Sequence, residues 1–566
     1  MCAIKGEVPS GPKGKVDSPY DPQMIFEPSP LPSPCPPASR MFLDGVTHAL
    51  GPLRDGQQRN EIHVVSWNVA AVNNNPFEYW ITHDDPAYNQ LMEGTQNFLD
   101  NPGDRDVAIH QVFTDKMFNQ LLCDMIDANI PGLKEVARIW RDCFSVKKIV
   151  SGFLKDTEIG KKRLASMPDR ITNTINTLGN EVQRRPTVIN YYSGDMATMS
   201  SWWAQWRNFM FRCEVEVFKG KAHKGPVRPQ VVYELLDPIL QSKYPAVTAE
   251  EEAISIPLQI LCLAIFDAVL VHMMISIAPH SWQNIRQSIA DAMLTGKERK
   301  TAQILMETYS DADVVFLQEA PGSIKESEML SALQGKFFRL APQGIDGKRD
   351  QNSLVLASRA TFVKESAFDI TEEVLVTLGQ SKGKTKKSFV HGDLIACTLQ
   401  DKEGAMFLLA SFHGDTNGFS TKPIVEAIHR TAEKSYPNHK IVIGLDANTY
   451  KVHSDQHQGV HDFNDFLTSE GMSSCWGDHV DPNSPTTCNS RTYLQPQLNK
   501  AIGKQDRLTR ADKNLKDWVV FNQSQLEPSS TLKDNTGKRH YIDDMVFPTM
   551  QFPSDHAIVS TVLSWK

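Results

Sequence analysis

The sequence predicts a mixed α/β (α+β) protein, and three observations support this fold class. Apolar runs typical of buried strands occur near residue 65 and again between about residues 311 and 560. The stretch between them, from about residue 77 to 300, instead has apolar residues at helical spacing. Several of the strand-like runs end in a polar residue, so these strand ends are candidates for one shared site.

Composition describes an ordinary globular protein. The 566 residues correspond to about two to four domains of average size. Hydrophobic residues make up 40% and charged residues 22% of the chain, which allows sizeable cores. The formal net charge of −8 argues against nucleic-acid binding over the whole surface, although a local basic patch would suffice.

The compartment is predicted by the cysteines and the first residues. The nine cysteines are scattered, with no C-x-x-C and no paired zinc spacing. We interpret them as reduced core thiols. The N-terminus has no apolar segment of the secretory type, so we expect a cytoplasmic or nuclear protein.

Residues 1–58 precede the first strand pattern, and residues 7–40 are rich in Pro, Ser and Gly. This composition cannot build a core, so we expect a disordered tail, with a short ligand for a Pro-binding domain as the alternative. The first strand pattern, residues 61–70, then ends in Asn68. An Asn at a strand end usually stabilises a turn. The functional alternative is contact with a metal or a phosphate.

Helical patterns dominate the next 200 residues or so, for example over residues 112–122. An aromatic cluster here predicts a core or an interdomain seam, with a base-stacking or lipid-facing surface as the alternative. Its members are Trp202, Trp203, Trp206, Phe209 and Phe211.

One apolar run, residues 254–278, is long enough to cross a bilayer. It contains Pro257, Gln259, Asp267 and His272. An ionisable group at mid-bilayer is costly. We therefore expect a buried helix and no integral membrane segment, with a spanning helix as the alternative.

Strand patterns return in the last 260 residues or so. One ends in Gln318-Glu319, another begins at Asn352, and a third ends in His413 and a polar loop that contains Asn417. Each such residue is, by itself, more often structural than functional.

The run Ile441-Val442-Ile443-Gly444-Leu445-Asp446-Ala447-Asn448 reads as a buried strand that breaks into a loop. Residues i and i+2 of a strand face the same side, so Asp446 and Asn448 are expected to point into one site. Such a carboxylate can take a proton from water, and the amide can hold a phosphate oxygen. The alternative is a turn closed by an Asx hydrogen bond.

In this order, the strand ends resemble the endonuclease/exonuclease/phosphatase (deoxyribonuclease I-like) superfamily. The resemblance covers about 280 residues, 59–76 plus 305–566. It implies a four-layer α-β-β-α sandwich of two mostly antiparallel sheets, with the site at one edge. The motifs that support it are Asn68, Gln318-Glu319, His413, Gly444-Leu445-Asp446-Ala447-Asn448 and Ser554-Asp555-His556.

The resemblance also implies roles for single residues. Asn68 and Glu319 correspond to the metal-site pair, with Glu319 as the principal Mg²⁺ ligand and Mn²⁺ as the alternative ion. Asp446 corresponds to the carboxylate that positions or deprotonates the attacking water, and Asn448 to its phosphate-orienting partner. Hard oxygen ligands of this kind suit Mg²⁺, which stabilises charge in a displacement at phosphorus.

At the C-terminus, Asp555 corresponds to an orienting or metal-ligating Asp, and His556 to the His that contacts the scissile phosphate. His413 corresponds to a His of several branches. A further Asp at a strand start orients the site His, and both Asp517 and Asp543 fit it. We favour Asp517, because Asp543 leaves too little chain for two strands before Asp555. Asp543 and the residue after it would then lie on the returning strand.

The chain departs from the family by its spacing, because about 250 residues separate Asn68 from Glu319. We therefore expect residues 77–304 to form a helical insertion beside the metal edge, where it could restrict substrates or bind a protein partner. Asn352, Asn417 and Asp543 are further candidates for substrate contact, with loop or strand-end roles as alternatives.

These signals predict a Mg²⁺-dependent phosphoesterase that hydrolyses a phosphodiester, as a nuclease does, or a phosphomonoester. The substrate would be a phosphate ester and the candidates include nucleic acid. One alternative is an inositol or lipid phosphatase or a sphingomyelinase-like enzyme. Another is a non-catalytic scaffold that binds through the helical insertion, although every expected acid is present.

Overall fold

The computed structural model describes residues 60–566 apart from residues 72, 180, 218–227, 322–327, 344–350 and 381–389. The predicted tail, residues 1–58, lies outside this part of the chain. The described chain is a mixed α/β structure with two six-stranded sheets and many helices. The sequence predicted this fold class correctly.

The first sheet contains both ends of the described chain, and its order is β15-β16-β1-β6-β8-β7. Strands β1 and β6 are parallel, and the other neighbours are antiparallel. The strands span Glu61–Asn68 (β1), Val314–Ala320 (β6), Phe337–Leu340 (β7), Asn352–Ser358 (β8), Leu526–Asp534 (β15) and Ile558–Trp565 (β16).

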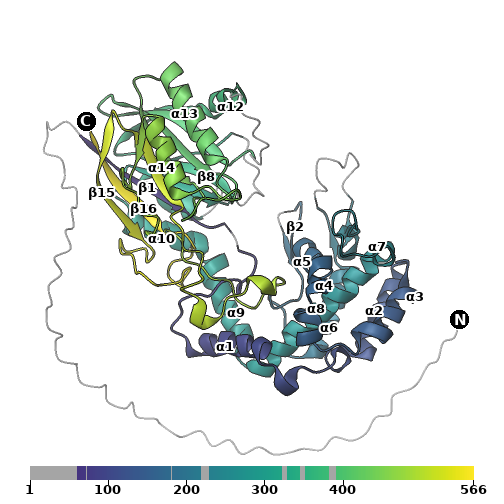
Figure 1. Ribbon diagram of the computed structural model, residues 1–566. Helices are drawn as coiled ribbons and strands as arrows, with labels where there is room; N and C mark the ends of the chain where they lie inside the picture. The colour runs from purple at the N-terminus through teal and green to yellow at the C-terminus, as the bar shows by residue number, and fades with distance from the viewer. Residues whose placement is uncertain are drawn as a thin grey trace, which may run out of the picture. The chain divides into compact units, whose positions relative to one another are not determined.

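The second sheet has the order β13-β14-β12-β11-β10-β9, and here β11 and β12 are the parallel pair. Figure 1 shows helices α12, α13 and α14 near one another among these strands. The strands span Phe362–Asp369 (β9), Leu394–Asp401 (β10), Met406–His413 (β11), Lys440–Asp446 (β12), Met472–Ser474 (β13) and Asp517–Asn522 (β14). The helices span Thr371–Gln380 (α12), Thr421–Ser435 (α13) and Val460–Ser469 (α14).

Both faces of strand β12 are buried, which explains its unbroken apolar sequence. Val442 belongs to a core that draws residues from both sheets, whereas Ile441 and Ile443 pack with α13 and α14. This alternation is the two-residue period of a strand. Gly444 allows a close approach between the sheets, because a Cβ there would lie 2.3 Å from Phe316.

Helices dominate the described chain between β1 and β6. One continuous core joins them to the first sheet, since Trp67 of β1 and residues of most of these helices belong to it. The helices are α1 (Pro86–Asp100), α2 (Asp115–Asp127), α3 (Leu133–Ile139), α4 (Thr157–Lys162), α5 (Ser166–Thr172), α6 (Met199–Arg212), α7 (Ala249–Ala253), α8 (Ser255–Ile277), α9 (Trp282–Ala290) and α10 (Lys297–Glu307).

Helix α8 is a buried core helix, as the sequence predicted. In the described part of the chain it is the one helix long and apolar enough to cross a membrane, but most of it is buried. Its Asp267 accepts hydrogen bonds from Arg185 Nε (2.7 Å) and Trp206 Nε1 (2.9 Å). This buried carboxylate is therefore paired inside the protein.

The aromatic cluster also lies in this core. Trp202, Trp203 and Trp206 are at most 5% exposed, and the rings of Trp203 and Trp206 stack with centroids 5.3 Å apart. The prediction of a core or seam is consistent with this burial. A base-stacking surface would need exposed rings.

One strand prediction was wrong. Asp543 and Asp544 do not lie on a returning strand, because β14 returns through β15 after three residues, and both aspartates are exposed in a turn. The apolar residues that follow them suggested a strand. Their side chains, Val546 and Phe547, instead fill the core from an irregular segment.

Candidate active site

Strand register places three of the predicted residues in a row across the second sheet. His413 pairs with Asp446 in the β11–β12 register, and Asp446 pairs with Asp517 in the β12–β14 register. Neighbours in register lie on the same face of a sheet. His413 Nε2 accordingly lies 3.5 Å from Asp446 Oδ2. The three strand positions therefore form one polar row at the edge of the sheet.

The first sheet contributes Asn68 and Glu319 to the same place. The amide nitrogen Nδ2 of Asn68 donates to Glu319 Oε1 (3.2 Å) and to Asp446 Oδ2 (2.9 Å). Its amide oxygen accepts from the backbone N–H of Ala70. Asn68 thus bridges carboxylates of both sheets through its nitrogen.

The buried amide of Gln318, the residue before Glu319, joins the two sheets. Gln318 Nε2 lies within hydrogen-bond distance of Ser66 Oγ (3.3 Å), Ser411 Oγ (3.1 Å) and the carbonyl of Gly444 (3.3 Å). These partners belong to β1, β11 and β12. Gln318 therefore connects the strands whose ends hold the site.

Two residues of the site have a left-handed backbone. Glu319 has φ 51° and Asn448 has φ 48°, both in the left-handed region. At Glu319 the strand pairing shifts register, which turns its side chain out of the regular alternation. Strain of this kind persists where the surrounding structure holds it, and it is frequent at functional sites.

The alternation argument for Asp446 and Asn448 does not apply. Strand β12 ends at Asp446, and Asp446 Oδ1 accepts the backbone N–H of Asn448 (2.9 Å) in an Asx turn. The turn nevertheless leaves Asp446 Oδ2 facing Asn68 and His413. In the described structure the buried Nδ2 of Asn448 has no partner, so one amide donor at the site is available for a ligand.

His556 is held by the Asp at the start of β14. Its Nδ1 lies 3.0 Å from Asp517 Oδ2, and Thr486 Oγ1 donates to the same carboxylate oxygen (2.5 Å). Burial disfavours a charged imidazole, but Asp517 and Asp446 outweigh it and raise the pKa of His556 to about 10. The imidazole is therefore protonated at neutral pH.

Asp446 is ionised although it is buried. Burial alone would raise the pKa of its carboxyl, but His556, His413 and Lys516 outweigh burial and hold this pKa below its usual value. An ionised carboxylate can accept a hydrogen bond from a water molecule or approach a metal.

The donor set suits a divalent metal. Among the described residues, Glu319, His413 and Asp446 offer ligand atoms that all lie within 4.8 Å of one another. A second such group is Asp446, Asp517 and His556. The carboxylates of Glu319 and Asp446 both accept a hydrogen bond from Asn68 Nδ2, so two carboxylate oxygens lie close together beside Asn68. Carboxylate oxygens favour Mg²⁺ or Mn²⁺, and a nearby imidazole is better suited to Mn²⁺.

Besides Asn68 and Asn448, four predicted residues lie outside these two groups. Asp555 accepts from Asn489 Nδ2 (3.3 Å). Asn352 is buried and donates to the carbonyl of Ala320, next to Glu319. The last two, Asn417 and Asp543, are exposed in a loop and a turn.

Sequence reasoning missed several polar residues beside the site. Thr486 and Asn489, which contact Asp517 and Asp555, come from an irregular segment without a recognisable pattern. Lys516 directly precedes Asp517 and is buried, with its ammonium bonded to Asp512 Oδ2 (2.9 Å). The one sequence signal for Lys516 was its position directly before Asp517, the predicted first residue of a strand.

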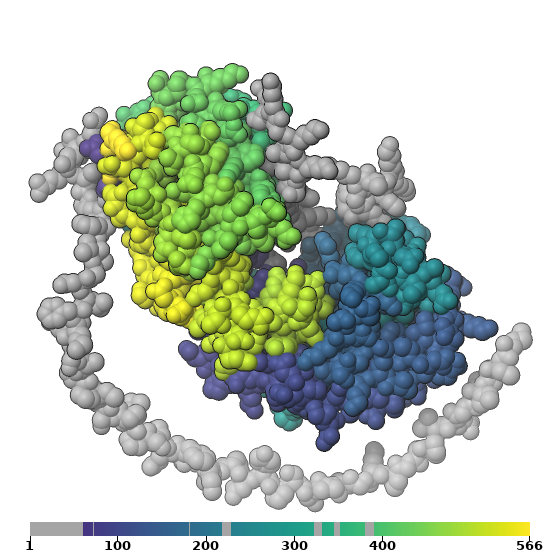
Figure 2. Space-filling view, viewed as in Figure 1, coloured from purple at the N-terminus to yellow at the C-terminus, as the bar shows by residue number. Residues whose placement is uncertain are grey.

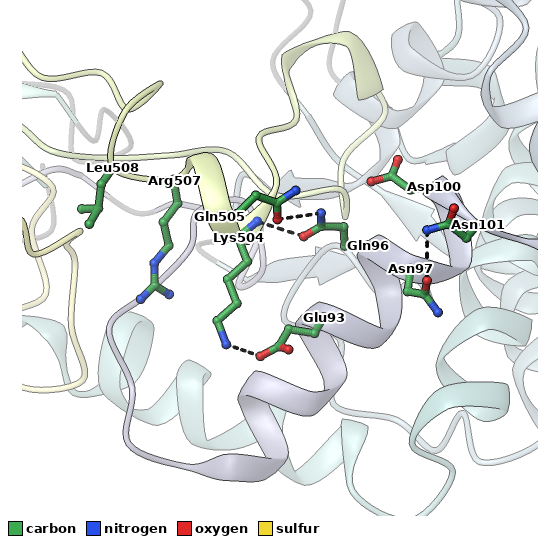
Figure 3. A pocket seen from close by; sticks show the side chains of 9 residues that line it. All are labelled: Glu93, Gln96, Asn97, Asp100, Asn101, Lys504, Gln505, Arg507 and Leu508. Atoms are coloured by element: carbon green, nitrogen blue, oxygen red, sulfur yellow. Dashed lines mark hydrogen bonds and ion pairs between the residues drawn. The ribbon is translucent and has the colours of Figure 1, made fainter.

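A groove lies elsewhere, between α1 and residues 504–508, and has a volume of about 620 Å³. Figure 3 shows Lys504 and Gln505 of its wall bonded to Glu93 and Gln96 of α1. The two segments also meet at the surface in Figure 2. None of the predicted site residues lines this groove, so its size does not identify the active site.

Comparisons with known proteins add little to this geometry. Residues 106–287 match a family described as "Domain of unknown function (DUF8234)". This match lies within the helical region and includes none of the strand-end residues. No curated protein matches the chain.

Several solved structures are similar to about half of the chain. The human Nocturnin catalytic domain with bound sulfate is 13% identical and covers 50% of this chain and 90% of its own, with a TM-score of 0.32. An endonuclease/exonuclease/phosphatase from Bacteroides vulgatus is 12% identical, with coverages of 48% and 92% and a TM-score of 0.31. ANGEL2, a 2′,3′-cyclic phosphatase, is 14% identical, with coverages of 49% and 87% and a TM-score of 0.33. Similarity at this level assigns neither a fold family nor an activity to the chain.

Proposed function

We propose that the protein is a metal-dependent phosphoesterase that hydrolyses a phosphate ester by in-line attack of water. The observation that supports this most is that Glu319 and Asp446 both accept a hydrogen bond from Asn68 Nδ2, beside a His556 held by Asp517. Two anionic groups and one cationic group at a single point suit a cation together with a phosphate.

Each residue would have a distinct task. Asp446 accepts a hydrogen bond from the attacking water and takes its proton as the new bond to phosphorus forms. His556 donates from Nε2 to the negative charge that develops on the phosphoryl oxygens while the bond to the leaving oxygen breaks. Asp517 holds His556 through Nδ1. Asn448 would donate its free amide to another phosphoryl oxygen.

Glu319 and, by rotation of its amide, Asn68 would hold the ion beside Asp446, with Mg²⁺ as our first choice. When bound, such an ion would neutralise charge on the phosphoryl group. His413 lies 3.6 Å from Glu319 Oε1 and would orient that carboxylate or contact the substrate. Asp555 would be a further ligand from the terminal loop.

We also propose that this site belongs to a four-layer α-β-β-α catalytic unit built from residues 59–76 and 305–566. The mixed core between the sheets, and the separate cores on their outer faces, support this arrangement. Residues 77–304 would be an insertion into this unit. The proposal does not depend on a membrane segment, and it fits a cytoplasmic or nuclear protein.

Hydrolysis of a substrate panel tests the proposal. The panel contains single- and double-stranded DNA, RNA, inositol phosphates, nucleotides and sphingomyelin. We expect activity on one class with Mg²⁺, loss of this activity with a chelator, and loss by Asp446→Asn. The exposed Asp465→Asn is the matched control and should retain activity. Activity that survives the chelator and Asp446→Asn would contradict the proposed site.

A further inference from the structure

A small cavity lies beside the candidate active site and has a wall from the helical region. Its lining includes Asp555 and Tyr79, together with Tyr191, Met293 and Lys297. All of these residues except Asp555 belong to the chain between β1 and β6, so this region reaches the cavity. The cavity volume is about 50 Å³, room for a few water molecules at about 10–15 Å³ each. It is therefore too small for a nucleobase.

Lys297 is the cation of this cavity. It is the first residue of α10 and is only 9% exposed. Its ammonium donates to the backbone carbonyls of Ala70 and Ala71, the latter at 2.7 Å. An ammonium has three N–H donors. Within the described ranges the third donor has no acceptor, so it is available to a ligand.

The charges around Lys297 are incompletely balanced. Asp555 and Glu319 are the acidic groups that act on it, yet in the described structure neither forms an ion pair with it. A buried ammonium without a counter-ion is costly. If Asp555 and Glu319 face a metal, as proposed above, the lysine gains its counter-ion only when an anion enters.

We propose that Lys297 is a substrate-binding residue whose free N–H donates to a phosphate oxygen in this cavity. The inference rests on the proposed phosphoesterase function and extends it, because a residue outside the predicted catalytic unit would contact the substrate. The interaction would take place at a buried ammonium, where a charge-assisted hydrogen bond is strong.

The competing explanation is that Lys297 has only a structural role, through its two hydrogen bonds to Ala70 and Ala71. They anchor the loop that follows Asn68, and a purely structural lysine would need nothing more. Removing an anchor would lower thermal stability or kcat through misplacement of Asn68. Removing a phosphate contact would weaken phosphate binding and raise KM. The two roles therefore differ in what is measured.

The experiment uses the full chain with Mg²⁺ and compares wild type with Lys297→Met and Lys297→Arg. The control is Arg299→Gln, an exposed cation on the same helix. Binding of inorganic phosphate is measured by calorimetry, and KM and kcat are measured on p-nitrophenyl phosphate and its bis ester. We expect Lys297→Met to weaken phosphate binding by about 10–100-fold, the range of a hydrogen bond to a charged group. Lys297→Arg should recover part of it, and the control should bind as wild type does.

Equal phosphate affinity of wild type and Lys297→Met, with or without a lower Tm, would overturn the inference, as would a wild type that binds no phosphate. Different outcomes would reject the proposed function. Phosphate binding that depends on Lys297 in a protein without hydrolytic activity would support the inference and reject the phosphoesterase. Metal-dependent hydrolysis with KM and phosphate affinity unchanged by Lys297→Met would do the reverse.

Discussion

At the scale of single residues, the site combines buried charges with strained backbone. Asp446, Asp517 and His556 are nearly inaccessible and neutralise one another in part. Glu319 and Asn448 adopt left-handed φ angles that glycine would adopt more easily. A left-handed φ at a residue other than glycine costs stability, so mutations at these two positions should separate stability from activity.

Asn448→Gly is the clearest such mutation. The change removes an amide whose Nδ2 has no partner and relieves the positive φ. We expect a free energy of unfolding within about 1 kcal/mol of wild type or higher. We expect kcat to fall about 100-fold, as for loss of one donor to a developing oxyanion. Urea unfolding and steady-state kinetics measure both, and a large loss of stability would show that the amide is structural.

Metal binding should stabilise the folded protein through Glu319. With Mg²⁺ at about 100 times its dissociation constant, linkage predicts about 2.7 kcal/mol of added stability. A rise in Tm with Mg²⁺ should be seen in wild type and be reduced in Glu319→Gln. The exposed Glu307→Gln is the matched control and should keep the full rise. Equal metal-induced shifts in wild type and Glu319→Gln would remove Glu319 from the ligand set.

At the scale of elements, the site depends on how closely the sheets approach and on their register. Gly444 in β12 packs against Phe316 of β6. Two residues further along β6, the side chain of Gln318 bonds to strands of both sheets, including the carbonyl of Gly444. A one-residue slip in β12 would turn Asp446 away from His413 and Asp517. Sheet packing therefore positions the two halves of the proposed metal site.

Gly444→Ala tests this dependence. The new Cβ would meet the Phe316 ring at 2.3 Å, so we expect a loss of about 1–3 kcal/mol in the free energy of unfolding. Gly379→Ala is the matched control, because nothing lies within 4 Å of its Cβ position in helix α12. That change should stabilise by up to about 1 kcal/mol. Urea unfolding of both variants checks this, and a neutral Gly444→Ala would mean that the sheets can separate without cost.

At the scale of the whole molecule, the helical region and the first sheet share one core. Trp67 and Leu317 of the sheet belong to the same cluster as Trp206 and Leu261 of the helical region. Lys297 also bonds to the loop after Asn68. Two parts that share a core and a loop contact are expected to unfold together.

We therefore expect a single cooperative thermal transition. Six of the ten tryptophans lie in residues 77–304, so tryptophan fluorescence reports in large part on the helical region. It should change at the same temperature as far-UV circular dichroism and as loss of hydrolytic activity. Destabilising α8 by Arg185→Met should lower all three midpoints together, since it leaves Asp267 without its ion-pair partner. Activity that survives after the fluorescence transition would mean that the region folds independently of the site.

Much of this molecule could be predicted from local patterns. The strands that end at Asn68, His413 and Asp446 are long apolar runs, and buried strands impose that pattern regardless of their partners. Helix α8 and the tryptophans of α6 were predicted as core for the same reason. The strand ends also indicated which polar residues were worth considering, and the spacing favoured Asp517 as the first residue of its strand.

Only the tertiary structure decided which of these residues meet. Asp517 lies against His556 and Asp543 does not, because a three-residue hairpin after β14 sends the chain into β15. Asn448 leaves the strand in a left-handed turn, which no periodicity indicates. Thr486, Asn489 and Lys297 come from irregular or distant segments. The sequence determines which faces are apolar, because that depends on neighbouring residues, whereas contacts between residues hundreds of positions apart depend on how the sheets pack.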